Sequence, residues 1–153
     1  MRRSDRKAEQ PDLGVLASRL LFAVQDEMFA RLAEAGHDRL RPQHGSVLAF
    51  LDEEGSRATE LARRSGQHKQ VIGKLLDELE QLGYVERRPD PQDRRAKLVV
   101  PTARGRDEMR RSDAIVDQIA ARHRAEIGDL AFSEFLRTLV DVTARQRAWR
   151  DAD

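Results

Sequence analysis

The sequence contains no cysteine and few aromatic residues, with one tryptophan, one tyrosine and five phenylalanines among 153 residues. The absence of cysteine excludes disulfide bonds, thiol catalysis and oxidant sensing through cysteine. No apolar run approaches the roughly 20 residues needed to cross a bilayer, so we expect no membrane contact. Residues 1–7 are basic and polar with no apolar block after them, which predicts that no signal peptide is present. We therefore expect a cytoplasmic protein.

Charge is abundant and unevenly distributed. Charged residues make up 36% of the chain and apolar residues 39%, a composition that suits long solvated helices better than a compact enzyme core. The net charge is only +1, but residues 57–111 carry 14 Lys or Arg against 9 Asp or Glu, a net of +5. Residues 1–56 and 112–153 each carry a net of −2. A basic patch confined to one segment is typical of a surface that binds phosphates.

Apolar residues recur at spacings of three or four along most of the chain, which predicts a mainly helical protein. The predicted helices cover about residues 13–35, 42–54, 58–65, 67–82, 103–127 and 132–149. Gly36, Gly66 and Gly83 each follow one of these helices and predict where it ends. In the fourth helix we expect six apolar side chains to face inward: Val71, Ile72, Leu75, Leu76, Leu79 and Leu82.

Two short strands are predicted after the fourth helix, at 84–88 and 97–100, with a polar basic loop at 90–97 between them. A helix pair followed by an Arg-tipped hairpin is typical of proteins that read DNA, because one helix fits the major groove while the loop reaches the neighbouring minor groove. The predicted fold class is therefore mainly α with a small β-hairpin wing, a winged helix-turn-helix.

The helices at the two ends of the chain are too long and too apolar to serve only a winged domain of about 60 residues. We expect a single domain over residues 1–153, with the winged helix-turn-helix at about 40–102 and dimerisation helices at about 12–36 and 102–150. A second copy of the chain would cover the apolar stripes of these helices. A two-fold homodimer would place two recognition helices roughly 34–36 Å apart, one turn of DNA.

The outward face of the fourth helix carries the predicted major-groove contacts, which are Gln67, His68, Lys69, Gln70 and Lys74. Gln70 suits adenine, and Lys69 or Lys74 suits guanine or phosphate. Gly73 lies on the same face, where a glycine costs roughly 1 kcal/mol relative to alanine. Two interpretations stay open for Gly73: close approach of the helix to DNA, and close packing against another helix.

The loop between the strands carries the predicted wing contacts, which are Asp93, Arg94, Arg95 and Lys97. The potential of a narrow minor groove favours an arginine inserted there. We expect Asp93 to pair with Arg95 and fix its direction. The alternative is a charged hairpin that is merely solvated.

Four segments carry a resemblance to a known family: LARRSGQHKQV at 61–71, LEQLGYV at 79–85, DPQDRRAKLV at 90–99, and Thr102-x-x-Gly105. They resemble the MarR family of winged-helix transcriptional regulators, whose wing signature is similar to Asp93-x-Arg95. The resemblance implies a homodimer, built from the first, fifth and sixth predicted helices, that binds a pseudo-palindromic operator in double-stranded DNA. It also implies Arg95 in the minor groove, and the fourth helix over the major groove.

Many members of this family are repressors released by small phenolic or aromatic carboxylate ligands, so the resemblance implies a small-molecule effector. Arg19 and His44 are the candidate ligand-binding residues, because an arginine on an apolar helix can bind a carboxylate through two hydrogen bonds. The alternative for Arg19 is an ion pair within its helix or between subunits. None of the four histidines lies in a tight cluster with metal-ligand spacing, so we expect neither a metal nor another cofactor.

Two functions other than operator binding can be compared with the sequence. An enzyme is not expected, because the chain has no phosphate-binding glycine loop, no nucleophile elbow and no convincing acid–base pair. A winged helix used for protein contacts without operator binding is the alternative function. Such a module would not require the excess of Lys and Arg on the fourth helix and the loop.

Overall fold

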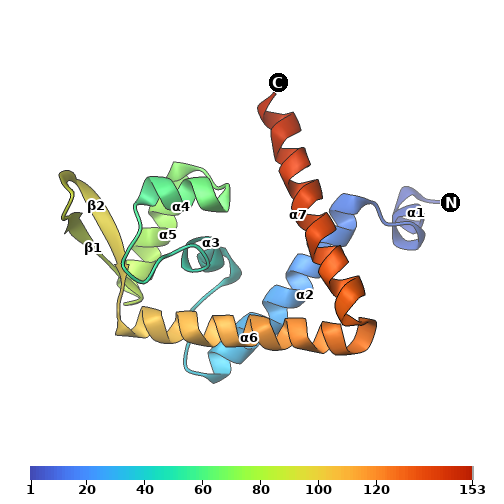
Figure 1. Ribbon diagram of the computed structural model, residues 1–153, viewed down its shortest axis with the longest axis horizontal. Coiled ribbons are helices and arrows are strands. Elements are labelled where there is room, and N and C mark those ends of the chain that lie inside the picture. The colour runs from blue at the N-terminus through green and yellow to red at the C-terminus, as the bar shows by residue number, and fades with distance from the viewer. Residues whose placement is uncertain (153) are drawn as a thin grey trace. The chain divides into compact units, whose positions relative to one another are not determined.

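The computed structural model describes residues 1–152 as a mainly helical chain with one two-stranded hairpin (Figure 1). The elements are α1 (Arg3–Glu9), α2 (Leu13–Glu34), η1 (Pro42–His44), α3 (Gly45–Leu48), α4 (Ala58–Ser65), α5 (Lys69–Gln81), β1 (Val85–Asp90), β2 (Asp93–Pro101), α6 (Ala103–Ile127) and α7 (Asp129–Asp151). The residues group into two compact units, Met1–Asp113 and the residues from Ala114 onward. None of the described helices is long and apolar enough to cross a membrane.

The long first helix of the sequence prediction is confirmed as α2. The side chain of Asp12 accepts a hydrogen bond from the backbone N–H of Val15 at 3.0 Å, which caps the helix start. Gly36 follows the helix with a φ of +100°, a conformation that favours glycine. In the N-terminal half of α2 several apolar side chains are exposed: Leu13, Leu16, Leu20, Leu21 and Phe22. The short helix α1 before it was not predicted.

The second predicted helix is much shorter than expected. It consists of the single turn η1 and of α3, which ends at Leu48 rather than near Gly55. The cause is tertiary: Ser56 pairs with Val99 of β2 through two backbone hydrogen bonds of 2.9 Å. A turn at residues 52–55 leads the chain into this pairing, closed by the Gly55 N–H, which donates to the Asp52 carbonyl at 3.0 Å. The residues before Ser56 therefore form this turn in place of the last part of the predicted helix.

The helix-turn-helix consists of α4 and α5, joined through Gly66 at a φ of +74°. The recognition helix α5 starts at Lys69, two residues later than predicted, because the extended backbone of His68 forms its N-cap. Ile72, Leu75, Leu76 and Leu79 are buried, and Leu82 packs partly buried against the core. The prediction for Val71 was wrong, because this side chain is 41% exposed at the edge of the apolar stripe.

The end of α5 is tied to the wing and to α6. Gly83 and Tyr84 donate backbone hydrogen bonds to the carbonyls of Glu80 and Leu79, which is the Schellman arrangement at a helix end. The Thr102 hydroxyl donates to the Gly83 carbonyl at 2.6 Å and accepts from the Gly105 amide at 3.1 Å, so it caps the start of α6.

Gly105 brings the start of α6 against this junction. A Cβ atom at Gly105 would lie 2.2 Å from the backbone oxygen of Tyr84, a contact that no other residue type could make. In the Thr102-x-x-Gly105 motif, the threonine therefore caps α6 and the glycine allows the backbone of α6 to lie against that of Tyr84.

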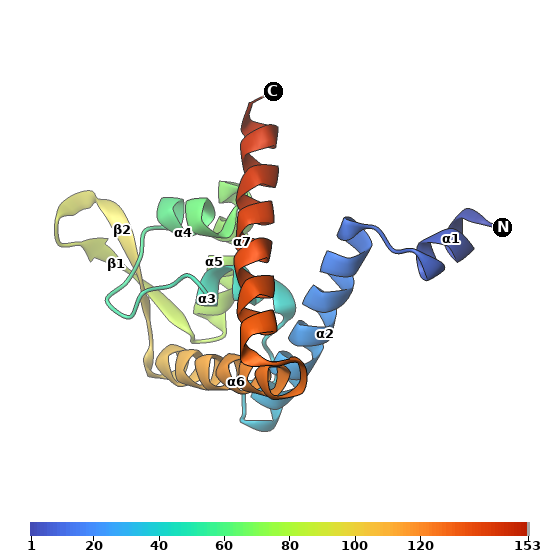
Figure 2. The same cartoon turned by 45° about the vertical axis from the view of Figure 1, so that its right-hand side comes forward.

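The wing strands are longer than predicted, and both views show the hairpin projecting beyond α3, α4 and α5 (Figures 1 and 2). The antiparallel register pairs Pro89 with Lys97 and Asp90 with Asp93. Residues 94–96 consequently have no partner on β1 and form a bulge near the tip. The predicted polar loop is thus mostly strand, but its two central arginines lie outside the ladder.

In the second unit, Gly128 separates the end of α6 from α7 with a φ of +95°. The guanidinium of Arg124 lies 4.9 Å from the ring centre of Phe132 and donates to the Ser133 hydroxyl at 2.8 Å, which fixes this turn. Phe132 is buried. The unit also exposes large apolar side chains: Val116, Ile127, Leu130, Phe135, Leu136, Val140 and Trp149.

Candidate nucleic-acid interface and effector pocket

The start of α5 is an open, hydrogen-bonding surface. All five residues predicted to contact the major groove are exposed: Gln67, His68, Lys69, Gln70 and Lys74. Within residues 1–152, none of these side chains is engaged in a hydrogen bond or ion pair with the protein. The N-terminal end of a helix also carries a partial positive charge that favours phosphate. This surface can therefore hydrogen-bond an external partner without breaking internal contacts.

Two of the three acidic residues of α5 are paired with a cation of the same chain. Arg87 on β1 pairs with Asp77 at 2.9 Å and with Glu80 at 3.3 Å. Glu78 accepts a hydrogen bond from the ring of His44 at 2.9 Å and keeps its charge. The ion pairs with Arg87 offset negative charge on the helix and lower the electrostatic cost of bringing it near a phosphate backbone.

Two residues of α5 bear on how closely a partner could approach. A Cβ atom on Gly73 would meet nothing within 4 Å, so no helix of the described chain packs there and the packing interpretation loses its support. Val71 is exposed next to Gln70, and an aliphatic side chain in the major groove can contact the methyl group of thymine. Sequence analysis missed Val71, because its position fits the apolar stripe equally well.

The wing brings Arg94 and Arg95 together in the bulge, and Asp93 and Lys97 flank them; all four are exposed. Asp93 acts on Arg95 through the backbone: its carboxylate accepts the Arg95 N–H at 3.0 Å. The structure shows this turn contact in place of the expected ion pair between side chains. The guanidinium of Arg95 is left available to a partner, within the described part of the chain.

A partly buried ion pair fixes the base of the bulge and was not predicted from the sequence. Asp90 is 7% exposed and accepts hydrogen bonds from the Gln92 amide at 2.9 Å and from Arg57 at 2.8 Å. The Gln92 hydrogen bond, together with the Arg57 guanidinium, lowers the pKa of Asp90. Arg57 is the N-cap residue of α4, so this pair ties the wing to the helix-turn-helix. Residues 33 positions apart give no local signal of such a contact.

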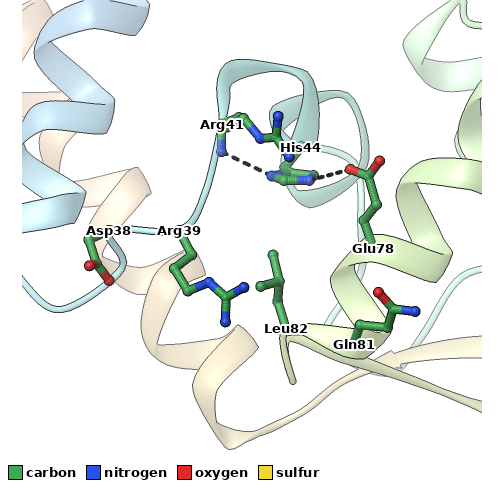
Figure 3. A pocket seen from close by; sticks show the side chains of 7 residues that line it. All are labelled: Asp38, Arg39, Arg41, His44, Glu78, Gln81 and Leu82. Atoms are coloured by element: carbon green, nitrogen blue, oxygen red, sulfur yellow. Dashed lines mark hydrogen bonds and ion pairs between the residues drawn. The ribbon is translucent and has the colours of Figure 1, made fainter.

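A second candidate site is a pocket of about 360 Å³ formed by the loop after α2, η1 and the C-terminal half of α5 (Figure 3). Its lining residues are Asp38, Arg39, Arg41, His44, Glu78, Gln81 and Leu82. The predicted ligand residue His44 is among them. Arg19, the other predicted ligand residue, is exposed on α2 and does not line this pocket.

His44 is 1% exposed and is held at both ring nitrogens. Its Nδ1 accepts the backbone N–H of Arg41 at 3.0 Å, so the ring proton lies on Nε2 and is donated to Glu78. The His44 hydrogen bond is the main cause that lowers the pKa of Glu78, and the charges of Lys74 and Arg41 act in the same direction. Glu78 is therefore an ionised carboxylate in the wall of the pocket.

His37 belongs to a separate buried network. Its Nε2 faces the carboxylate of Asp107 at 2.9 Å, and its Nδ1 accepts the Tyr84 hydroxyl at 2.8 Å. Nearby, burial raises the pKa of Glu108, whose Oε2 has no hydrogen-bond partner in the described structure. Among residues 1–152, no group of three or more His, Asp or Glu side chains is arranged to hold a metal ion.

Comparisons with known proteins match this geometry to one family. The family model described as MarR family matches residues 40–96, which include the helix-turn-helix and most of the wing. The crystal structure of CouR from Rhodococcus jostii RHA1 bound to p-coumaroyl-CoA is 33% identical, covering 86% of this chain and 92% of that chain, with a TM-score of 0.70. A MarR-family transcriptional regulator from Rhodococcus sp. RHA1 is 31% identical, covering 93% of this chain and 95% of that chain, with a TM-score of 0.67. The chain belongs to the MarR family.

A third structure shows the transcriptional repressor CouR bound to a 23-mer DNA duplex. This chain is 26% identical to it, with 96% of this chain and 99% of that chain covered and a TM-score of 0.64. A search of curated protein sequences finds no match. As a MarR-family regulator, the chain has the winged helix-turn-helix that its sequence predicted.

Proposed function

We propose that this MarR-family regulator is a cytoplasmic, two-fold homodimeric repressor that binds a pseudo-palindromic operator. The observation that carries the proposal is the set of exposed cationic and amide side chains at the start of α5 and in the wing bulge. None has a protein partner in residues 1–152, whereas the acids of α5 are engaged. In this proposal Gln70 and Lys74 contact the major groove, and Arg95 enters the minor groove.

The exposed apolar faces of α2 and α7 support the homodimer. Leu13 and Phe22 on α2 are 58% and 60% exposed, and Leu130 and Val140 on α7 are 71% and 70% exposed. Large exposed apolar patches on soluble proteins are typical of interfaces. A second copy covers them, and its symmetry places the second recognition helix one DNA turn away. In domain terms, the winged helix-turn-helix spans about 40–102 within a single functional domain, flanked by dimerisation helices at about 12–36 and 102–150.

We propose that a small aromatic acid or its coenzyme A thioester releases the operator. CouR, 33% identical to this chain, binds p-coumaroyl-CoA, which combines an aromatic ring with phosphate groups. His44 lines the pocket against α5, where a ligand would act directly on the recognition helix. Arg19 lies exposed on α2 among apolar side chains, where it would bind a ligand carboxylate or an acid of the second subunit.

The proposal is tested by gel shifts with the DNA upstream of the protein's own gene, over a range of salt concentrations. We expect site-preferring, salt-sensitive binding, since each neutralised phosphate adds about −0.9 to the log–log salt slope. Binding without salt dependence or site preference would overturn the regulator function and favour a module for protein contacts. Titration with p-coumarate and p-coumaroyl-CoA then tests release.

Arg95→Ala should weaken operator binding and lower the salt slope by about 1, because one cationic contact with DNA is lost. The dimer should persist in gel filtration, since Arg95 lies in the wing. Arg3→Ala in α1 is the matched control, removing an exposed arginine remote from the expected DNA face. Equal losses in the two variants would show that Arg95 contributes only general charge.

A further inference from the structure

The pocket beside α5 contains two arginines without protein partners. Throughout residues 57–111, every arginine outside the wing bulge has an acceptor in the protein. These arginines are Arg57, Arg63, Arg64, Arg87, Arg88, Arg104, Arg106, Arg110 and Arg111. Arg39 and Arg41 lie outside this segment, and within the described residues neither guanidinium has a hydrogen bond or an ion pair. Both line the 360 Å³ cavity, where the charge of Arg41 also helps to lower the pKa of Glu78.

The nearby carboxylates do not satisfy these arginines. Glu78 is directed to the ring of His44 at 2.9 Å. In Figure 3 the Asp38 carboxylate turns away from the other lining residues, while the Arg39 side chain extends toward Leu82. Leu82 is the one apolar side chain in the lining, so the cavity suits a polar group better than an aromatic ring.

We propose that this pocket binds a phosphate-bearing group of the effector through Arg39 and Arg41, with the Gln81 amide as a further donor. A guanidinium presents paired N–H groups that match phosphate oxygens, and such charge-assisted hydrogen bonds are among the strongest in proteins. The inference rests on the proposed function and deepens it: the phosphate part of the ligand occupies this cavity, and any aromatic part lies elsewhere.

The pocket is connected to the recognition helix by a short chain of hydrogen bonds. The backbone N–H of Arg41 donates to His44, and His44 donates to Glu78 on α5. An anion held by Arg41 also repels the ionised Glu78 across the cavity. Both effects act on α5, whose N-terminal half carries the proposed DNA contacts. Phosphate binding should therefore change the affinity for the operator.

Calorimetric titration of the full chain tests the proposal with coenzyme A, inorganic pyrophosphate and p-coumarate as probes. We expect coenzyme A to bind the wild-type protein, and its affinity to fall about tenfold or more in the double variant Arg39→Ala/Arg41→Ala. The matched control is Arg3→Ala/Arg6→Ala, which removes the same charge from exposed positions in α1. Its affinity should equal that of the wild type.

The probes separate the sources of phosphate. Binding of coenzyme A but not pyrophosphate, lost in the double variant, identifies a coenzyme A conjugate; binding of both identifies a general phosphate site. No binding of either phosphate probe to the wild type, or equal binding to the double variant, overturns the inference. Equal weakening in the control also overturns it, since net charge would then explain the effect.

Gel shifts without ligand on the same three proteins keep this test separate from that of the proposed function. If the wild type fails to bind the operator, the repressor proposal fails, whatever the calorimetry shows. If operator binding is intact in all three proteins and only the phosphate titrations disagree, the repressor proposal stands and the phosphate pocket does not. Because Arg39 and Arg41 are exposed, their replacement should leave the melting temperature unchanged, which excludes misfolding as the cause.

Discussion

The apolar side chains of α5 and those of α2 have opposite surroundings in the single chain. Ile72, Leu76 and Leu79 on α5 are fully buried at 0% exposure, whereas Leu20 and Phe22 on α2 are 41% and 60% exposed. Both helices show apolar residues at helical spacing, so the pattern alone does not distinguish them. The winged part completes its core within one chain, and α2 keeps an apolar face that a second chain would cover.

Leu76→Ala should produce the largest effect, because it creates a cavity in a core that one chain completes. We expect a loss of about 2–5 kcal/mol in the free energy of unfolding. Chemical denaturation measures this loss, and most of it should persist when the protein concentration is varied. A loss that vanishes at high protein concentration would mean that the core of the winged part also depends on the partner.

Leu20→Glu tests the exposed apolar face of α2. A carboxylate placed in the proposed dimer face should weaken the dimer by about 2–4 kcal/mol, because its charge would be buried without a partner. Analytical ultracentrifugation measures the dissociation, and operator affinity should fall with it. The control is Arg3→Ala, outside the apolar face. An undisturbed dimer would exclude this part of α2 from the interface.

Gln70→Ala tests the exposed face at the start of α5, opposite its buried apolar side chains. We expect a loss of about 1–3 kcal/mol of discrimination at one base pair, with stability unchanged because Gln70 is exposed. Competition gel shifts with single-base operator variants measure it. Lys74→Ala is the companion variant, expected to weaken binding to all sequences alike. Equal loss on operator and random DNA for Gln70→Ala would assign this residue to the phosphate backbone.

Glu108→Gln should have the smallest effect and probes a buried carboxyl group close to His37. Burial raises the pKa of Glu108 above its usual value of 4.5, so the folded state favours the protonated form. The stability from this group is therefore complete below about pH 4.5 and is lost as the pH rises through the raised pKa. The melting temperature of the variant relative to wild type should rise from pH 4 to pH 8, by about 2–4 °C at most. A difference that is constant with pH would contradict the assignment.

Most of the fold followed from local patterns. The spacing of apolar residues predicted α2, α4, α5 and α6, and the glycine at position 66 predicted the turn between α4 and α5. The exposed cationic face of α5 also followed, since the leucine row sets which side is outward. Local reasoning did not place Val71, because a residue at the edge of a stripe is buried only if a neighbour covers it.

The errors share one physical origin. The helix after Pro42 ends early because Ser56 must pair with Val99, a residue more than forty positions away. The wing is fixed by Asp90 and Arg57, and α5 is tied to η1 by Glu78 and His44. None of these contacts produces a repeating pattern of residue types in the sequence, because each joins two segments that are far apart in the chain.

The amino-acid sequence by itself determined the helical stripes, the glycine-bounded turns, the concentration of basic charge in residues 57–111 and hence a winged DNA-reading module. The assembled tertiary structure alone decided which acids are neutralised, how the wing arginines leave the β-ladder, and that Arg39 and Arg41 stand unpaired at a cavity against α5. The reason is one of range: hydrophobic periodicity and capping act within a few turns of the chain, whereas ion pairs and cavities require the positions of residues that only folding brings together.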